Sequence, residues 1–408
     1  MLPLLEQIAA ATAGTERELI DAAILAKALH RAGRWREAEG RLRVLLEQAV
    51  QQQAFRLASG IAGELINLMR DTGRYAEALA LVEQKQDYTR RAGLGPWTQL
   101  GDEARRLQLL VRLGRNEEAL AAVERLRPTL KTLPEAGDRE ETMLPWSVRE
   151  LILDTGRSAA RGLERWEDAL ALNAEVLQSK SNRHAPALEQ ARTRFNDGFP
   201  LLRLQRYAEA CDVLEGCRAT FAAENDVEML GKVFSALADL EDELNHRDRA
   251  IALEHTALRY GYLAGDPQDC AGGHFNLVIY LRRAGGPPAM ALAQRLAAVM
   301  IGFQIASGRL PSRLQALAEN LADFPANPPL PANFAALCET VEQVEGVRFR
   351  ELFERLPKDR AATGDEALQQ VLTLARQVQP VQPVQPQARP RSGLGRLGGW
   401  LGRWWRRS

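Results

Sequence analysis

One short pattern returns seven times along the first three quarters of the chain. It reads GRWREAE, GRYAEAL, GRNEEAL, ERWEDAL, QRYAEAC, HRDRAIA and GPPAMAL. We take the third residue of each copy as a reference position, at Trp35, Tyr75, Asn116, Trp166, Tyr207, Arg247 and Pro288. The steps between these positions are 40, 41, 50, 41, 40 and 41 residues. A fixed period of this length is typical of units stacked in a solenoid.

Each copy is predicted to be a helix, a short turn and a second helix. Three residues after the reference lies an alanine, which indicates that two helices approach closely there: Ala38, Ala78, Ala119, Ala169, Ala210, Ala250 and Ala291. Glycine at Gly33, Gly73, Gly114 and Gly286 predicts the stop of the first helix. The column seven residues before the reference is mostly apolar and is expected to pack, whereas the column eight before it is mostly polar and is expected to face outward. Strand-like alternation is nearly absent, so the predicted fold class is all-α.

The motif Gly-x-aromatic-x-x-Ala at a helix-turn-helix corner resembles the tetratricopeptide repeat (TPR). The resemblance covers roughly residues 15–305 and is clearest in GRYAEAL, with Gly73, Tyr75 and Ala78. The period of about 41 residues exceeds the family's usual 34 or so, as in the extended repeats of kinesin light chains and of bacterial regulatory TPR proteins. The resemblance implies a right-handed superhelical solenoid of about seven TPR-like helical hairpins with C-terminal capping helices.

Changes in the pattern suggest six segments. Residues 1–127 are expected to hold repeats one to three, and 147–305 repeats four to seven. Residues 128–146, with three prolines, are expected to form an inserted loop or a joint between two sub-arrays. Residues 306–378 are expected to form capping helices, 379–390 a proline-glutamine linker, and 391–408 a separate tail. In RFNDGFPLLRLQRYAEA, Gly198 and Pro200 interrupt a predicted helix. That interruption either bends the groove near Arg194, Asn196 and Asp197 or provides an ordinary close helix crossing.

Chemistry-bearing motifs are scarce. The sequence lacks the P-loop, GxGxxG, HExxH and GxSxG patterns. Cys270 and His274 are four apart on a predicted helix, but no further ligand lies near them in sequence, so we expect a half-buried thiol beside a polar histidine. The four cysteines form no CxxC pair and are expected to be reduced thiols of a cytosolic protein. We therefore predict no catalytic residue, metal or cofactor, and a protein that is not an enzyme.

Recognition of another protein is the remaining function. In the TPR family the first helix of each unit lines the concave surface. Asparagine side chains can pair with the backbone of an extended peptide, and arginines with carboxylates. Applied to this chain, the resemblance predicts that the first helices form a protein- or peptide-binding face. The alternative is that these polar side chains are solvated and bind no specific ligand. The candidate residues are Lys27, Asn67, Arg70, Gln108, Asp154, Arg161, Asn196, Asp239, Asn276, Tyr280 and Arg283.

The last eighteen residues, RSGLGRLGGWLGRWWRRS, form a basic amphipathic pattern. From Arg389 onward there are six arginines and no acid, so the rest of the chain has 47 basic and 53 acidic residues. An anionic membrane surface and a groove on a partner protein both fit this tail, nucleic acid fits less well, and a basic end without a role is the alternative. The residues expected to make contact are Leu397, Trp400, Leu401, Arg403, Trp404, Trp405, Arg406 and Arg407.

These observations together predict a non-enzymatic adaptor or regulatory scaffold. The alternative is a sensor that closes on a peptide or small molecule and thereby regulates an effector protein. The N-terminus lacks a basic leader followed by a long apolar core, and no stretch approaches eighteen uninterrupted apolar residues. The expected location is therefore cytoplasmic, with a peripheral position at the inner face of the membrane as a second option.

Overall fold

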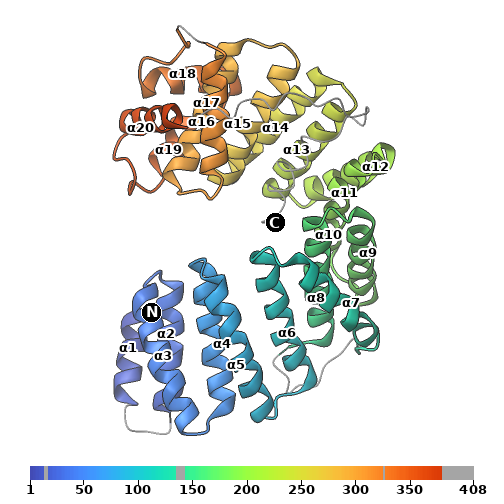
Figure 1. Cartoon of the computed structure of the whole chain (residues 1–408), viewed down its shortest axis with the longest axis vertical. Coiled ribbons are helices and arrows are strands. Elements are labelled where there is room, and N and C mark those ends of the chain that lie inside the picture. Colours follow the sequence, from blue (N-terminus) through green and yellow to red (C-terminus); the bar gives the residue numbers. More distant parts are fainter. Residues whose placement is uncertain (13–16, 135–142, 325–326, 379–408) are drawn as a thin grey trace. The chain divides into compact units, whose positions relative to one another are not determined.

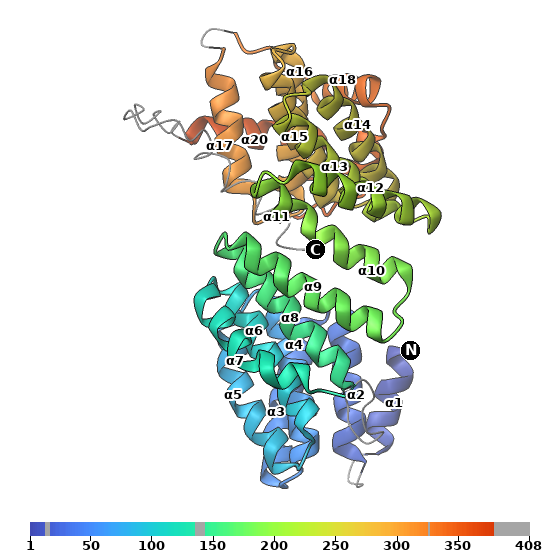
Figure 2. The same ribbon diagram turned by 90° about the vertical axis from the view of Figure 1, so that its right-hand side faces the viewer.

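The computed structural model describes residues 1–12, 17–134, 143–324 and 327–378. Within these residues the regular structure is helical and includes no β-strand, so the chain is an all-α helical-repeat protein, as predicted. Its helices divide into two compact units, unit 1 from Met1 to Ala185 and unit 2 from Pro186 onward. Each unit is a series of helices that pack on their neighbours in sequence order (Figures 1 and 2).

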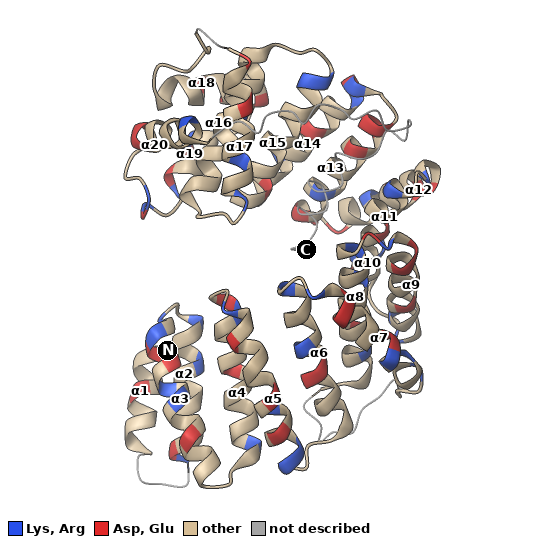
Figure 3. Cartoon of the chain, in the orientation of Figure 1, with Lys and Arg blue, Asp and Glu red and all other residues tan. Residues whose placement is uncertain are grey.

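Unit 1 holds the first four predicted hairpins and an extra helix before them. Its helices are α1 (Leu2–Ala11), α2 (Glu18–Arg31), α3 (Trp35–Gln51), α4 (Phe55–Asp71), α5 (Tyr75–Arg91), α6 (Pro96–Arg112), α7 (Asn116–Lys131), α8 (Pro145–Gly162) and α9 (Trp166–Asn182). Proline stands in the first turn of α1, α6 and α8, where its missing N–H costs nothing. Acidic and basic residues lie side by side on α3 and α5 (Figure 3), and pairs such as Arg43–Glu39 join them one turn apart.

Unit 2 holds the last three hairpins and four further helices. Its elements are α10 (Ala187–Arg194), the 3-10 turn η1 (Phe195–Asp197), α11 (Gly198–Arg203), α12 (Tyr207–Ala223), α13 (Val227–Glu243), α14 (Arg247–Ala264), α15 (Pro267–Arg283), α16 (Pro288–Gln304), α17 (Leu310–Ala322), α18 (Phe334–Glu345), α19 (Phe349–Glu354) and α20 (Gly364–Gln377). Side chains of Asp266 and Asn333 cap α15 and α18 by accepting backbone N–H groups.

The repeat register read from the sequence coincides with the helix boundaries. All seven reference residues, Trp35 through Pro288, are the first residues of helices: α3, α5, α7, α9, α12, α14 and α16. The alanine three residues later is at most 4% exposed in every copy, from Ala38 to Ala291. The second helix of each hairpin therefore begins where predicted, and its alanine packs in the helix-helix contact.

The turns inside the hairpins share one backbone conformation. Gly33, Gly73 and Gly114 lie in the left-handed region, with φ of 77°, 76° and 76°. The last hairpin corrects the prediction, because Gly285 and not Gly286 takes this conformation. Copies without the glycine adopt the same turn with other residues, at Glu164, Gln205 and Asn245. In each turn a backbone N–H reaches back to a carbonyl of the first helix, as from Arg34 to Leu29 at 3.0 Å.

The two predicted columns of the first helices behave differently. The apolar column is buried at Leu68, Leu109, Ala159, Pro200 and Leu240, as expected. The polar column is exposed at Lys27 but half-buried at Asn67 and Gln108. At Asp239 and Tyr280 the expectation of an outward-facing side chain is wrong, since both are buried between neighbouring first helices.

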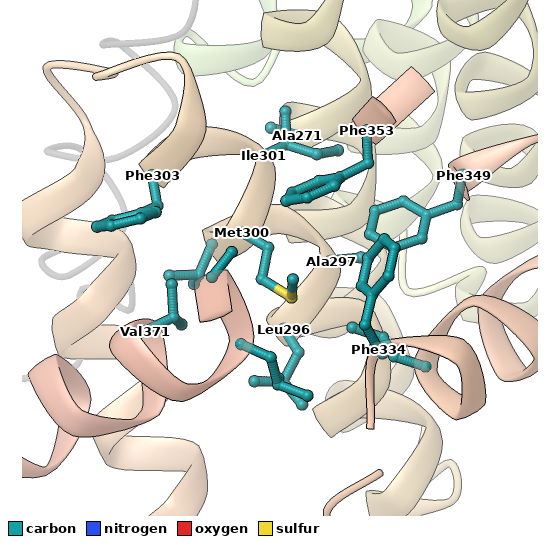
Figure 4. Close-up of a cluster of buried hydrophobic side chains, with 14 of the residues drawn as sticks. Ala271, Leu296, Ala297, Met300, Ile301, Phe303, Phe334, Phe349, Phe353 and Val371 are labelled. Atoms are coloured by element: carbon teal, nitrogen blue, oxygen red, sulfur yellow. The ribbon is translucent and has the colours of Figure 1, made fainter. Parts of the chain in front are cut away.

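The helices of 306–378 contribute to the largest core of unit 2. Figure 4 shows Leu296, Ala297 and Met300 of α16 among Phe334 of α18, Phe349 and Phe353 of α19 and Val371 of α20. Phe334 and Phe353 have ring centroids 4.9 Å apart. α18, α19 and α20 thus bury an apolar face that the last hairpin would otherwise expose.

The interruption predicted at Gly198 and Pro200 is present as η1, between α10 and α11. Proline has no N–H to donate to the carbonyl four residues earlier, so the helix tightens into a 3-10 turn. A Cβ added at Gly198 would lie 2.7 Å from a methyl of Leu214 on α12, so glycine permits close packing there. Arg194 is exposed, while Asn196 and Asp197 are half-buried. Gly198 therefore fits the close-crossing interpretation.

Candidate functional site

A groove of about 820 Å³ lies on unit 1 between the first helices of hairpins one and two. We call it the α2–α4 groove. Its main lining residues are Ile20, Ala23 and Ile24 of α2 and Leu57, Gly60 and Ile61 of α4. It belongs to the helices that the TPR resemblance assigns to the binding face, and it is mostly apolar.

The shape of the groove follows from residue size. Ile61 and Leu42 are buried and form its floor. Gly60 has no side chain, and a Cβ built there meets nothing within 4 Å. Ile20 and Ile24, one turn apart on α2, are each 47% exposed along the opposite wall. Exposed apolar side chains of this size around a hollow are typical of surfaces that bind a partner.

Charged side chains stand at both ends of the groove, and cations outnumber anions. At one end the Arg91 guanidinium lies over the Phe55 ring, 3.8 Å from its centroid, beside the exposed Arg56. At the other end Lys27 Nζ lies 3.9 Å from Glu64 Oε2. Glu64 also binds His30, whose Nδ1 is 2.9 Å from Oε1. Glu64, the one carboxylate among the described residues that line the groove, is thus shared between two partners.

The other predicted residues of unit 1 lie further along its first helices. The Asn67 side-chain oxygen accepts a hydrogen bond from Arg105 at 3.3 Å. Arg70 is exposed and lies 3.5 Å from Asp71, and Gln108 is half-buried. On α8, Asp154 accepts a hydrogen bond from Arg157 Nε at 2.9 Å. Arg161, on the same helix, is buried. Of the predicted residues, only Lys27 lines the groove.

In unit 2 the predicted residues of α15 contact residues of α13 exactly one repeat earlier. Tyr280 donates a hydrogen bond to Asp239, and Arg283 pairs with Asp242. The Asn276 amide donates to Ser235 at 3.2 Å. Each pair is separated by 41 residues. Asp239, Asn276, Tyr280 and Arg283 therefore join adjacent hairpins in this structure.

Two carboxyl groups are enclosed in this α13–α15 contact. Burial raises the pKa of Glu254, on α14, to about 8, and the nearby Asp239 adds to that shift. Burial likewise raises the pKa of Asp239 to about 7, although the hydrogen bond from Tyr280 opposes the shift. Ser235 donates to Glu254 at 2.9 Å, and Asn276 donates to it at 3.3 Å. These hydrogen bonds reduce the cost of burying the carboxyl, which is largely protonated at neutral pH.

Cys270 and His274 are both buried, and the expectation of half-burial is wrong. His274 belongs to a chain of hydrogen bonds across α14, α15, α16 and α18. The Tyr262 hydroxyl lies 2.7 Å from Nε2, and Nδ1 lies 2.5 Å from the Gln294 amide oxygen. Gln294 in turn donates to Glu345 at 2.6 Å. Burial lowers the pKa of His274 to about 4, so the ring is neutral, with the proton on Nδ1 and Nε2 accepting from Tyr262.

Burial raises the pKa of the Cys270 thiol, so that thiol is not an activated nucleophile. In the part of the chain that the structure describes, no three His, Cys, Asp or Glu side chains are grouped as a metal would require. Within that same part, no helix has the length and apolar character needed to cross a membrane. The tail residues from Leu397 to Arg407 lie outside the described residues.

Comparisons with known proteins do not identify a family for this chain. No family model matches the sequence, and no curated protein matches it. Among solved structures, the chain is similar to a circular tandem repeat protein with novel repeat topology and enhanced subunit contact surfaces. The identity is 12% and the TM-score 0.23, over 88% of this chain and 95% of the other. This likeness carries no argument, so the helical-repeat assignment depends on the helix order and packing described above.

Sequence reasoning missed the apolar part of the groove, although a signal was present. Ile20, Ile24 and Lys27 are spaced as i, i+4 and i+7, so they share one face of α2. Two isoleucines in line with an outward-facing lysine indicate apolar residues on an exposed face. The hollow itself could not be predicted from this helix alone, because small residues of two hairpins, Ala23 and Gly60, line it together.

Proposed function

We propose that this chain is a non-enzymatic protein-binding scaffold built from divergent TPR units. The α2–α4 groove is the observation that carries the proposal, because it presents exposed isoleucines around a hollow on the first helices of two hairpins. The seven helix starts and the buried alanine column support the assignment to TPR units. In this proposal the groove accepts a segment of another protein, and the remaining hairpins extend the surface.

The test compares capture of proteins from native lysate by three immobilised full-length chains: wild type, Ile24→Arg and Val44→Arg. Ile24 lines the groove, whereas Val44 on α3 is similarly exposed, at 54%, and lies outside it. We expect a protein that is retained by the wild type and by Val44→Arg and lost with Ile24→Arg. Equal capture by all three chains would overturn the groove as the binding site. Thermal unfolding of both variants controls for damage to the fold.

A further inference from the structure

The length and charge of the α2–α4 groove restrict its ligand further. We propose that it takes a short helical protein segment that carries apolar side chains between two acidic ones. This inference rests on the proposed function and specifies the partner of the same site. It depends on three features of the groove: its length, the position of its cations, and the ion pairs that already engage Glu64, the one carboxylate among its described lining residues.

The groove is about two helical turns long. On α2 it extends from Leu19 to Lys27, which is roughly 12 Å at about 1.5 Å per residue. On α4 it extends from Phe55 to Glu64, roughly 14 Å by the same rise. A ligand helix of two turns spans this length, with side chains at i, i+3, i+4 and i+7 on the face it presents. The two central positions then lie over the apolar hollow.

Cations stand where the two outer positions of such a ligand fall. Arg56 lies in the first turn of α4, is exposed and lines the groove. The Arg91 guanidinium, which also lines the groove, stacks on the ring of Phe55. Lys27 marks the other end, at the outer limit of an ion pair with Glu64. Glu64 is already bound to His30. The attraction between a ligand carboxylate and the cations at either end should therefore exceed its repulsion from Glu64.

The same charges argue against the chain's own tail as the occupant. From Arg389 onward the chain has six arginines and no acid. Placing that sequence in a groove with Lys27, Arg56 and Arg91 would bring like charges together. The partner is therefore assigned to another protein with an acidic, apolar helix.

The probe is a fluorescein-labelled, side-chain-stapled helix with two central leucines and a glutamate one turn before and one turn after them. Matched probes carry glutamine or lysine in place of both glutamates. Binding to the full chain is measured by fluorescence anisotropy at low and high salt. We expect the glutamine probe to bind about three- to tenfold more weakly than the glutamate probe, and the lysine probe more weakly still. Salt should reduce the difference.

Two glycine variants locate the binding. Gly60 and Gly40 are both helical, exposed and free of any atom within 4 Å of an added Cβ. Gly60→Phe fills the groove and should abolish binding, whereas Gly40→Phe on α3 should bind as wild type. The charge exchange Arg56→Glu should reverse the preference between the glutamate and lysine probes.

Each remaining outcome counts against the inference. Equal binding of the glutamate and glutamine probes would overturn the acidic preference while leaving a protein-binding groove intact. Binding that survives Gly60→Phe, or failure of every probe on the wild type, would overturn the ligand class. The proposed function would still be tested separately, by the lysate comparison of Ile24→Arg with Val44→Arg. A tail peptide of residues 391–408 that binds the groove, or self-association abolished by Gly60→Phe, would assign a different occupant.

Discussion

Glu254 is a carboxyl group enclosed by α13, α14 and α15, and its pKa of about 8 lies above the ordinary value. Between the unfolded and folded pKa values the native chain keeps a proton that the unfolded chain releases. Stability from this group is therefore fully present below about pH 4.5 and is lost as pH rises towards 8. Asp239, with a pKa of about 7, acts in the same direction. The two buried carboxyl groups therefore lower the free energy of unfolding of unit 2 increasingly as pH rises.

The variant Glu254→Gln should remove this dependence, because an amide keeps hydrogen bonds with Ser235 and Asn276 and cannot ionise. Relative to wild type, it should gain about 1–3 kcal/mol of unfolding free energy on going from pH 5 to pH 8. Chemical denaturation at both pH values measures the change. The control is Glu83→Gln, an exposed residue of α5, which should show no such gain. An equal loss for Glu254→Gln at both pH values would mean that the folded chain keeps Glu254 ionised.

Residue-scale reasoning from the sequence explains part of this contact. Ser235 and Asn276, Asp239 and Tyr280, and Asp242 and Arg283 are complementary pairs one period apart, so the pairing was readable from the repeat. The polar column taken alone predicts solvent-facing side chains, because a single column does not show that neighbouring first helices approach within hydrogen-bond distance. Burial of Glu254 was not predictable, since it comes from the second helix of the hairpin.

At the scale of elements, the turn between the two helices of a hairpin is the most regular feature. Gly114 and Glu164 occupy equivalent left-handed positions, with φ of 76° and 59°. Residues other than glycine carry a Cβ atom, which causes steric strain in this conformation. We expect Gly114→Ala to lower the unfolding free energy by about 1 kcal/mol and Glu164→Gly to raise it by about 0.5 kcal/mol.

Denaturant midpoints measure both changes, and Glu164→Ala is the matched control. It removes the same charge as Glu164→Gly but keeps the Cβ, so it should give no gain. If Glu164→Ala stabilises the chain as much as Glu164→Gly does, charge and not backbone strain explains the effect.

Helix positions could be predicted because the repeat supplies independent signals for each boundary. The 41-residue period and the alanine column locate α9 and α12 even though Glu164 and Gln205 replace the turn glycine. Helix α1 precedes the first copy of the motif, so the repeat gave no prediction for it. The α2–α4 groove depends on side chains from two hairpins, and periodicity within one hairpin does not encode it.

At the scale of the whole molecule, each hairpin packs mainly on its sequence neighbours. Stability in such arrays is close to a sum of local terms, so damage should stay local. Leu296 is fully buried in the core of α15–α20. Leu296→Ala should cost about 2–5 kcal/mol and speed amide hydrogen exchange across α15–α20. Exchange in α2–α6 of unit 1 should stay at the wild-type rate, and faster exchange there would show that the array unfolds as one cooperative unit.

We propose that the tail of residues 391–408 binds a membrane surface independently of the helical array, and truncation after Val378 tests this proposal. Three tryptophans and five arginines within residues 391–408 favour an interface between anionic headgroups and acyl chains. The full chain should therefore sediment with vesicles of phosphatidylserine and phosphatidylcholine, and less so at high salt or without phosphatidylserine. The truncated chain should remain in the supernatant yet bind the glutamate probe with unchanged affinity. Sedimentation of the truncated chain would place the lipid-binding surface on the helical array, and failure of the full chain to sediment would overturn a membrane surface as the target of the tail.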